Sequence, residues 1–129
     1  MSDGYQILSL DELETASHRG SNLIPVGHAL GFRPAGVNAW KAAAGGQLIP
    51  PHEGNSGIEK LYVVVQGHAR FTVGGEEAEA RAGTLVFVAP QVFRTAVAAE
   101  DDTVVFVAGG KVGEAFDAAG WDSFETPLA

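Results

Sequence analysis

The stretch G-Q-L-I-P-P-H-E-G-N-S-G-I-E-K-L-Y-V-V-V-Q-G, residues 46–67, decides the fold of this 129-residue chain. A glycine opens it, a histidine and a glutamate follow, and a mostly apolar run leads to a closing glycine. A second stretch, G-T-L-V-F-V-A-P-Q-V-F-R-T-A, residues 83–96, repeats a glycine followed by an apolar run and a proline. Short apolar runs between glycine and proline turns are typical of strands in antiparallel sheets and barrels.

Such β-type runs continue through most of the chain and are separated by glycine, proline and acidic turns. We expect strands at residues 37–42, 60–65, 69–73, 84–88, 92–98 and 103–108. Gly74 and Gly75 predict a two-residue hairpin turn, because glycine accepts the positive φ that such turns need. Residues 99–102 predict a second turn. Many short strands with no long helix between them indicate an all-β barrel or sandwich.

The two ends of the chain carry different signals. Ser9 and Glu12 form a capping box, with a hydroxyl at the N-cap and a carboxylate three residues on, which predicts a short helix over residues 10–17. The C-terminal tail contains Trp121 and Phe124, and we expect these aromatic side chains to pack on the barrel or on a partner.

Length, charge and composition exclude several classes of protein. We expect a single domain over residues 1–129, with a barrel core at about 23–110. A formal charge of -8 disfavours a nucleic-acid or anionic-membrane surface. The chain has no cysteine, which excludes thiolate catalysis and thiolate metal sites. It has no basic leader segment and no apolar run of about 18 residues, so we expect a cytoplasmic protein without a membrane span.

In their spacing, the two quoted stretches resemble the two motifs of the cupin superfamily. The likeness covers most of residues 30–121 and is to small single-domain cupins of unassigned function. It implies a double-stranded β-helix, or jelly-roll barrel, with a short N-terminal helix and a C-terminal tail. Cupins commonly pair through barrel strands, so the resemblance also implies a homodimer.

The resemblance further implies four metal-ligand positions, and most of them carry other residue types here. Counting from the motif glycines places these positions at His52, Gly54, Lys60 and Arg94. Glu59 would take the third position only if a one-residue bulge exchanged the two faces of its strand. One imidazole beside a glycine and two cations does not suit a divalent transition metal. We therefore expect no metal and no other cofactor, unless that bulge is present.

The same positions favour a small anionic ligand. Alternation along the strand places Lys60 and Tyr62 on the barrel-facing side. We predict that His52, Lys60 and Arg94 bind a carboxylate or phosphate, with a bidentate grip from the arginine and a further donor from the Tyr62 hydroxyl. Glu59 is included in the predicted ligand-binding set as the neighbour that a bulge would turn inward.

Two other interpretations of the interior stay open, beside a third in which the barrel is purely structural and serves protein interaction. In the first, Arg94 forms an internal salt bridge to Glu59 or Glu53 and the interior is merely packed. In the second, the chain is an isomerase, lyase or oxygenase type of enzyme that acts on a small polar substrate. His52 would then serve as general acid or base, or as the sole remaining metal ligand. No nucleophile paired with a base is visible, so the sequence leaves enzymatic activity undecided.

Four further side chains carry secondary expectations. Phe71, Val73 and Phe87 should supply apolar walls to the cavity. His18, next to a basic residue after the predicted helix, should be a solvated surface group.

Overall fold

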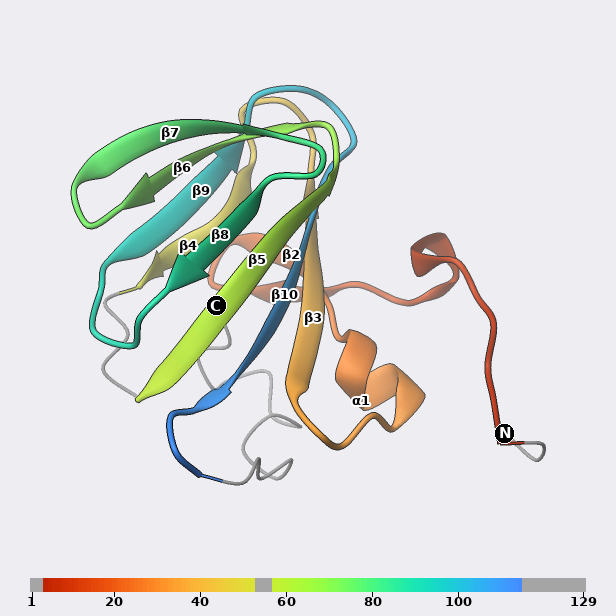
Figure 1. The fold of residues 1–129 in the computed structure, drawn as a ribbon. Helices are drawn as coiled ribbons and strands as arrows, with labels where there is room; N and C mark the ends of the chain where they lie inside the picture. Colours follow the sequence, from red (N-terminus) through yellow and green to blue (C-terminus); the bar gives the residue numbers. More distant parts are fainter. Residues whose placement is uncertain (1–3, 53–56, 115–129) are drawn as a thin grey trace.

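Two antiparallel sheets face each other in this computed structural model, which describes residues 4–52 and 57–114 (Figure 1). The described elements are, in chain order, η1 (Leu10–Glu12), β1 (Ala16–His18), β2 (Ser21–Ile24), α1 (Val26–Leu30), β3 (Gly36–Ala42), β4 (Gln47–His52), β5 (Ile58–Gln66), β6 (His68–Val73), β7 (Glu76–Arg81), β8 (Leu85–Val88), β9 (Arg94–Ala98) and β10 (Thr103–Lys111). None of the described helices is long and apolar enough to cross a membrane.

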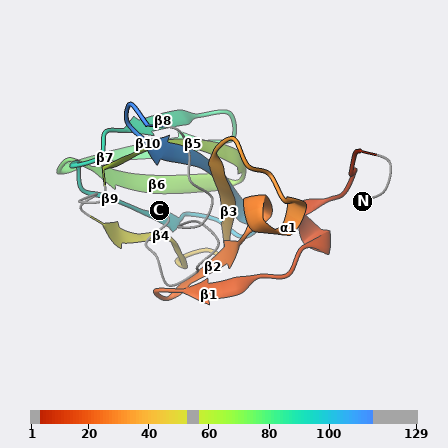
Figure 2. The ribbon, with the colours of Figure 1, turned by 90° about the horizontal axis from the view of Figure 1, so that it is seen from below.

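The larger sheet has the strand order β1-β2-β3-β10-β5-β8, and the smaller sheet has the order β4-β9-β6-β7. Seen from below, β1 and β2 curl beneath β4, so that the hairpin closes one side of the barrel (Figure 2). From β3 onward the chain alternates between the two sheets, except at the β6–β7 hairpin, whose two strands both belong to the smaller sheet. This arrangement confirms the all-β, jelly-roll prediction.

The core divides into two clusters. The main cluster lies between the sheets and is built from the inward-facing residues of their strands, including Trp40, Tyr62, Phe71 and Val105. A smaller cluster lies on the outer face of the larger sheet, where the N-terminal segment covers β3 and β10. Its buried members are Ile24, Val26, Ala39 and Val104, and Leu10, Leu13 and Leu30 pack against them.

The predicted hairpin turn is confirmed, because Gly74 and Gly75 have φ angles of 59° and 88° between the paired strands β6 and β7. The predicted helix over residues 10–17 is wrong beyond its first turn. Ser9 does cap the chain, since its hydroxyl accepts from the Asp11 amide at 3.3 Å, but only the short 3₁₀ turn η1 follows. Residues 16–18 instead pair with β2 as the first strand of a hairpin.

Two elements had no clear sequence signal. Helix α1 is only five residues long and ends at Gly31, whose φ of 72° stops it. Strand β4 contains Pro50 and Pro51, which disfavour a central strand. The prolines are tolerated because β4 is the edge strand of its sheet. The expectation for Trp121 and Phe124 lies outside the described residues.

Candidate functional site

Strand β5 places two of the predicted site residues on the inner face of the barrel. Lys60 and Tyr62 have exposed fractions of 2% and 0%, and they alternate with Glu59 and Leu61 on the other face. Pairing with β10 is regular from Val64 down to Ile58, and its irregularity lies farther up the strand. The bulge that would turn Glu59 inward is therefore not present in β5, and Glu59 lies apart from the cluster.

A glycine on the neighbouring strand makes room for the lysine. Gly109 of β10 is the cross-strand partner of Lys60. A Cβ atom at position 109 would stand 2.9 Å from Lys60 Cδ and 2.7 Å from the Glu59 carbonyl oxygen. Only glycine lets the lysine stem lie this close to β10. In the sequence, this role is marked by two consecutive glycines within an apolar strand. That signal does not by itself indicate a place in the site.

The smaller sheet supplies the other two residues. His52 and Arg94 are direct cross-strand partners in β4 and β9, with exposed fractions of 9% and 0%. The two sheets meet at this level, because the rings of Tyr62 and Phe71 are 5.9 Å apart. The arginine side chain lies within hydrogen-bond reach of the Tyr62 hydroxyl. It is also close enough to His52 and Lys60 for its charge to lower the pKa of both. Four of the five predicted site residues are thus brought together.

Main-chain carbonyl groups, and not carboxylates, hold the Arg94 guanidinium. Nε donates to the Val92 oxygen at 2.9 Å, and Nη2 donates to the oxygens of Ala89 and Pro90 at 3.0 and 3.2 Å. These bonds fix the turn between β8 and β9. Within residues 4–52 and 57–114, Arg94 forms no ion pair, so the suggested salt bridge to Glu59 is absent; Glu53 lies outside this range.

Two buried polar groups of the cluster lie next to each other. Arg94 Nη1 and Tyr62 Oη have no well-oriented hydrogen-bond partner among the described residues. Burial raises the pKa of Tyr62 to about 12, although the adjacent guanidinium partly opposes the rise, so the hydroxyl stays protonated. The predicted bidentate grip by Arg94 is not available, because Nε and Nη2 already donate to carbonyls. One amino group of the guanidinium is left for a ligand.

The cluster is electrostatically unfavourable to positive charge. Burial lowers the pKa of His52 to about 4, with smaller contributions from the charges of Arg94 and Lys60. Burial also holds the pKa of Lys60 well below its usual range, and the Arg94 charge adds to the effect. An anion beside these groups would oppose both pKa shifts, because its negative charge would offset the repulsion from Arg94 and stabilise the protonated forms of His52 and Lys60.

A transition metal of the kind that the sequence resemblance implies does not fit these residues. Arg94 cannot lose its proton and has no acceptor, and Lys60 takes the place of a carboxylate. In the described ranges no group of three or more histidine or acidic side chains lies close enough to hold a metal ion.

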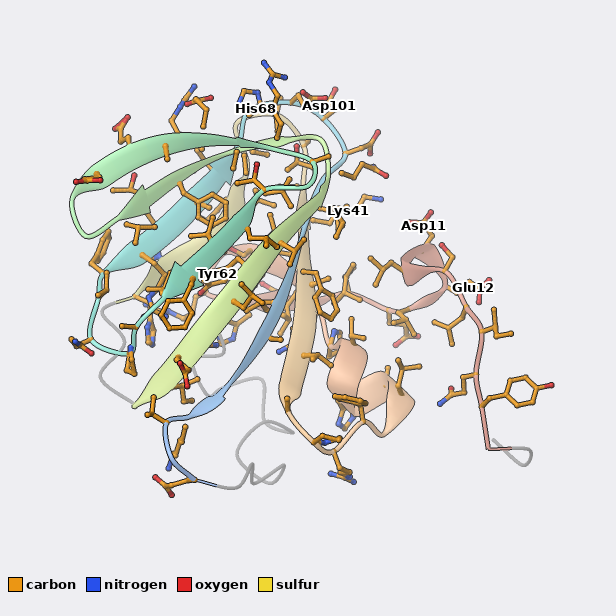
Figure 3. All side chains as sticks on the ribbon, viewed as in Figure 1. Asp11, Glu12, Lys41, Tyr62, His68 and Asp101 are labelled. Carbon is orange, nitrogen blue, oxygen red and sulfur yellow. The ribbon has the colours of Figure 1, made fainter. Side chains whose placement is uncertain are left out.

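Of the remaining histidines, His18 lies within electrostatic range of His52 and makes a small contribution to lowering its pKa, whereas His68 lies away from the cluster. The expectation that His18 is solvated is wrong, since it is 4% exposed and its ring centroid lies 5.8 Å from that of Trp40. The β1–β2 hairpin carries it inward, and Arg19 beside it donates to the Pro51 carbonyl at 2.8 Å. His68 lies at the upper rim of the barrel, away from Tyr62, where it contacts Glu79 (Figure 3).

The predicted apolar walls are only partly correct. Phe71 is 1% exposed and packs beside Tyr62, as expected. Phe87 is 62% exposed, so its assignment to the cavity is wrong. Strand β8 turns Val88 inward, and alternation then places Phe87 on the outer face. Every residue of this short run is apolar, so its sequence does not indicate which side chains face inward.

Comparison with known proteins agrees with the fold. A family model described as a cupin domain matches residues 40–109, which is more than half of the chain. A solved cupin protein from Bacteroides fragilis is 23% identical, with a TM-score of 0.67 and coverage of 87% of this chain and 88% of that chain. No curated protein sequence matches.

Two other similar structures are described by activity. A sugar phosphate isomerase of the cupin superfamily from Silicibacter pomeroyi is 18% identical, with a TM-score of 0.63 and coverage of 81% of this chain and 74% of that chain. A predicted oxalate decarboxylase from Thermotoga maritima is 15% identical, with a TM-score of 0.62 and coverage of 81% and 96%. At these identities the likeness shows the fold alone.

Proposed function

This chain belongs to the cupin family, and we propose that it is a small-molecule-binding barrel that holds a small anion, a carboxylate or a phosphate, without a transition metal. The observation that carries the proposal is the pair of buried groups without a well-oriented hydrogen-bond partner among the described residues, Arg94 Nη1 and Tyr62 Oη. A buried donor left without an acceptor costs about 1–3 kcal/mol, which an acceptor atom of a ligand would offset.

The surrounding groups favour negative charge in that acceptor. Lys60 comes from the facing sheet and His52 from the strand beside Arg94, so three potentially cationic side chains converge on one space. A ligand oxygen between Arg94 and Tyr62 would accept two hydrogen bonds. A second oxygen would lie toward Lys60, which gains its full charge when an anion is bound. Such charge-assisted bonds are stronger than neutral ones.

Catalysis on the same anion is the less favoured function. His52 is the candidate base, and its pKa of about 4 makes it neutral at pH 7 but only weakly basic. A general base works best when its pKa lies near the working pH. Anion binding requires hydrogen-bond donors and positive charge, which these residues can supply. Proton transfer at pH 7 requires a base with a higher pKa than His52 has.

Isothermal titration calorimetry at pH 7 with inorganic phosphate and with oxalate tests the proposal. These probes represent the two candidate chemistries, and erythritol serves as an uncharged control. We expect one site per chain for at least one anion and none for erythritol. Lys60→Met, which keeps the stem and removes the charge, should weaken binding by at least about tenfold, since that corresponds to one lost charge-assisted bond.

Lys41→Met is the matched control. Lys41 lies on β3 beside Asp11, 3.5 Å away, and is 39% exposed (Figure 3). Its removal should change the affinity by less than about twofold, because exposed charges are screened by solvent. Absence of binding by both anions, or an equal loss in the Lys60 and Lys41 variants, would contradict the proposed function.

A further inference from the structure

Lys60 differs from the other two lysines of the chain in its surroundings. Its side chain is 2% exposed and its amine nitrogen is buried in the barrel. Lys41, in contrast, is 39% exposed, and Lys111 is exposed at the end of β10. Burial of this kind changes the reactivity of an amine as well as its charge, because water no longer stabilises the protonated form.

Neighbouring strands fix the position of the lysine side chain. Cross-strand pairing places Gly109 on one side of Lys60 and Val88 on the other. The stem lies over Gly109, since a Cβ atom there would stand 2.9 Å from Lys60 Cδ. Tyr62 projects from the same face two residues along β5, about 7 Å farther up the strand. The charge of Arg94 acts on both side chains, so the amine and the tyrosine hydroxyl lie near the same guanidinium.

The surroundings of Lys60 favour the uncharged, nucleophilic form of its amine. Burial lowers the pKa of Lys60, and the positive charge of Arg94 lowers it further. Desolvation and a cationic neighbour are two ways in which proteins activate a lysine to attack a carbonyl group. Exposed lysines are almost fully protonated at pH 7 and attack poorly. The structure therefore places an activated amine inside the barrel.

Donors that suit a carboxylate lie beside this amine. They are Arg94 Nη1 and Tyr62 Oη, which have no well-oriented hydrogen-bond partner among the described residues. A small acid whose carboxylate accepts from these two donors would bring its next carbon atom toward Lys60. In a 2-oxo acid this next carbon is a carbonyl carbon, which is the group that an uncharged amine attacks. One small molecule can thus meet both halves of the site.

We propose that the ligand of this site is a small 2-oxo acid and that Lys60 Nζ binds it covalently and reversibly as an imine. The inference rests on the proposed function, and it adds the class of ligand and the bond. The amine attacks the carbonyl carbon, and a C–N bond forms. The carbonyl oxygen takes one proton from the nitrogen and one from solvent and leaves as water, which breaks its bond to carbon. The product is a protonated imine, and no oxidant or reductant is consumed.

The charges of the product suit the same site. The protonated imine is a cation beside the carboxylate of its own ligand, so Lys60 still contributes positive charge to anion binding. Arg94 cannot lose its proton, and burial keeps the Tyr62 hydroxyl protonated, so both remain donors to the carboxylate. Neither of them is a nucleophile in this state. The covalent bond therefore belongs to Lys60.

Reductive trapping tests the inference. Wild-type protein is incubated at pH 7 with pyruvate and cyanoborohydride, which reduces an imine to a stable amine, and labelled peptides are identified by mass spectrometry. We expect Lys60 to be labelled at least about tenfold faster than Lys41 or Lys111, because each unit of lowered pKa raises the uncharged fraction about tenfold. Lys60→Met should lose this label, and Lys41→Met should keep it. In wild type unfolded by urea, the three lysines should react at similar rates.

Two comparisons test the role of the carboxylate. Acetone has a ketone but no carboxylate, so it should label Lys60 at least about tenfold more slowly than pyruvate. Each rate is first divided by that of the same reagent on unfolded protein, which corrects for intrinsic reactivity. Tyr62→Phe keeps the ring and removes the hydroxyl. It should slow labelling by pyruvate severalfold and leave labelling by acetone unchanged, whereas a merely structural role would alter both alike. Thermal melts check that each variant is folded.

Three results would overturn the inference. Label on Lys60 that forms no faster than on the exposed lysines would exclude an activated amine. Equal corrected rates with pyruvate and acetone would exclude recognition of a 2-oxo acid. Calorimetry with phosphate and oxalate separates this inference from the proposed function. If an anion binds and Lys60 is not labelled, only the covalent step is wrong. If neither anion binds, the proposed function is wrong, and this inference fails with it.

Discussion

The two faces of β5 reverse the usual distribution of polarity in a barrel. Its inner face carries a lysine and a tyrosine, Lys60 and Tyr62, which are almost completely buried. Its outer face carries Leu61 and Val65, which are nearly half exposed. Buried charge and exposed apolar surface are both costly in an isolated chain. Each face therefore departs from the packing of an ordinary barrel strand, and on the inner face the proposed anion would offset the buried charge.

On the inner face, the reversal is local to one end of the strand. Farther along β5, Val64 is fully buried and pairs with Val105 of β10 in an ordinary apolar core. That core stabilises the fold and allows the polar end to depart from apolar packing. Local departures of this kind are expected at functional sites. The following predictions test the difference between the two faces, from the largest expected effect to the smallest.

Removal of the Arg94 side chain should have the largest effect on stability. Arg94→Ala leaves the carbonyls of Ala89, Pro90 and Val92 without their donors and opens a cavity, so we expect a loss of about 3–5 kcal/mol in the free energy of unfolding. Urea unfolding measures it. Arg70→Ala is the control, because Arg70 is 48% exposed in its contact with Glu79 and should cost less than about 1 kcal/mol. Similar losses in both variants would contradict a structural role for Arg94.

Replacement of Lys60 should stabilise the protein while it weakens anion binding. Lys60→Met keeps the volume and removes a charge that burial and Arg94 disfavour, so the free energy of unfolding should rise by about 1–3 kcal/mol. The pKa of Lys60 is lowered in the folded state. The unfolded state therefore binds more protons at high pH, and wild-type stability rises as the pH approaches the ordinary lysine value.

The advantage of methionine at position 60 should accordingly be largest at lower pH and shrink as the pH rises. Urea unfolding at several pH values measures this trend. A Lys60→Met variant that is less stable than wild type at neutral pH would mean that the lysine is held by a favourable structural ion pair.

Acidification should destabilise the protein through His52. The pKa of His52 falls from the usual 6.5 to about 4 on folding, so the unfolded state binds more protons between these values. The stability associated with neutral His52 is complete above pH 6.5 and is lost as the pH falls to about 4. With an allowance for partial solvation, we expect a loss on the order of 1–2 kcal/mol over this window.

Comparison of variants isolates this contribution from the carboxylates that titrate in the same range. His52→Asn should show a shallower decline in stability with falling pH, whereas His28→Asn, at an exposed position, should follow wild type. Identical pH profiles for all three proteins would show that His52 is not sensitive to its surroundings.

The smallest effect on monomer stability should come from the outer face. Leu61→Thr changes a side chain that is 40% exposed and keeps β propensity, so the free energy of unfolding of the monomer should change by about 0.5 kcal/mol or less. A large loss of monomer stability would mean that Leu61 belongs to the core.

Part of the site follows from spacing. The period of two along β5 correctly predicts that Lys60 and Tyr62 share the inner face, and the paired glycines predict the β6–β7 hairpin. These predictions depend on neighbours in the chain. The exposure of Phe87 and the burial of His18 could not be predicted in this way, because each depends on which strand lies beside it. The helix predicted after Ser9 failed because tertiary pairing of residues 16–18 with β2 outweighed the local capping signal.

The amino-acid sequence alone determined the all-β class, the turn positions and the replacement of metal-ligand positions by cations, because residue type, spacing and alternation are local properties. Only the tertiary structure decided what those cations contact. The hydrogen bonds of Arg94 to the β8–β9 turn, its open Nη1 beside the Tyr62 hydroxyl and the room that Gly109 makes for Lys60 all join residues from different strands. Such contacts exist only once two sheets have packed face to face.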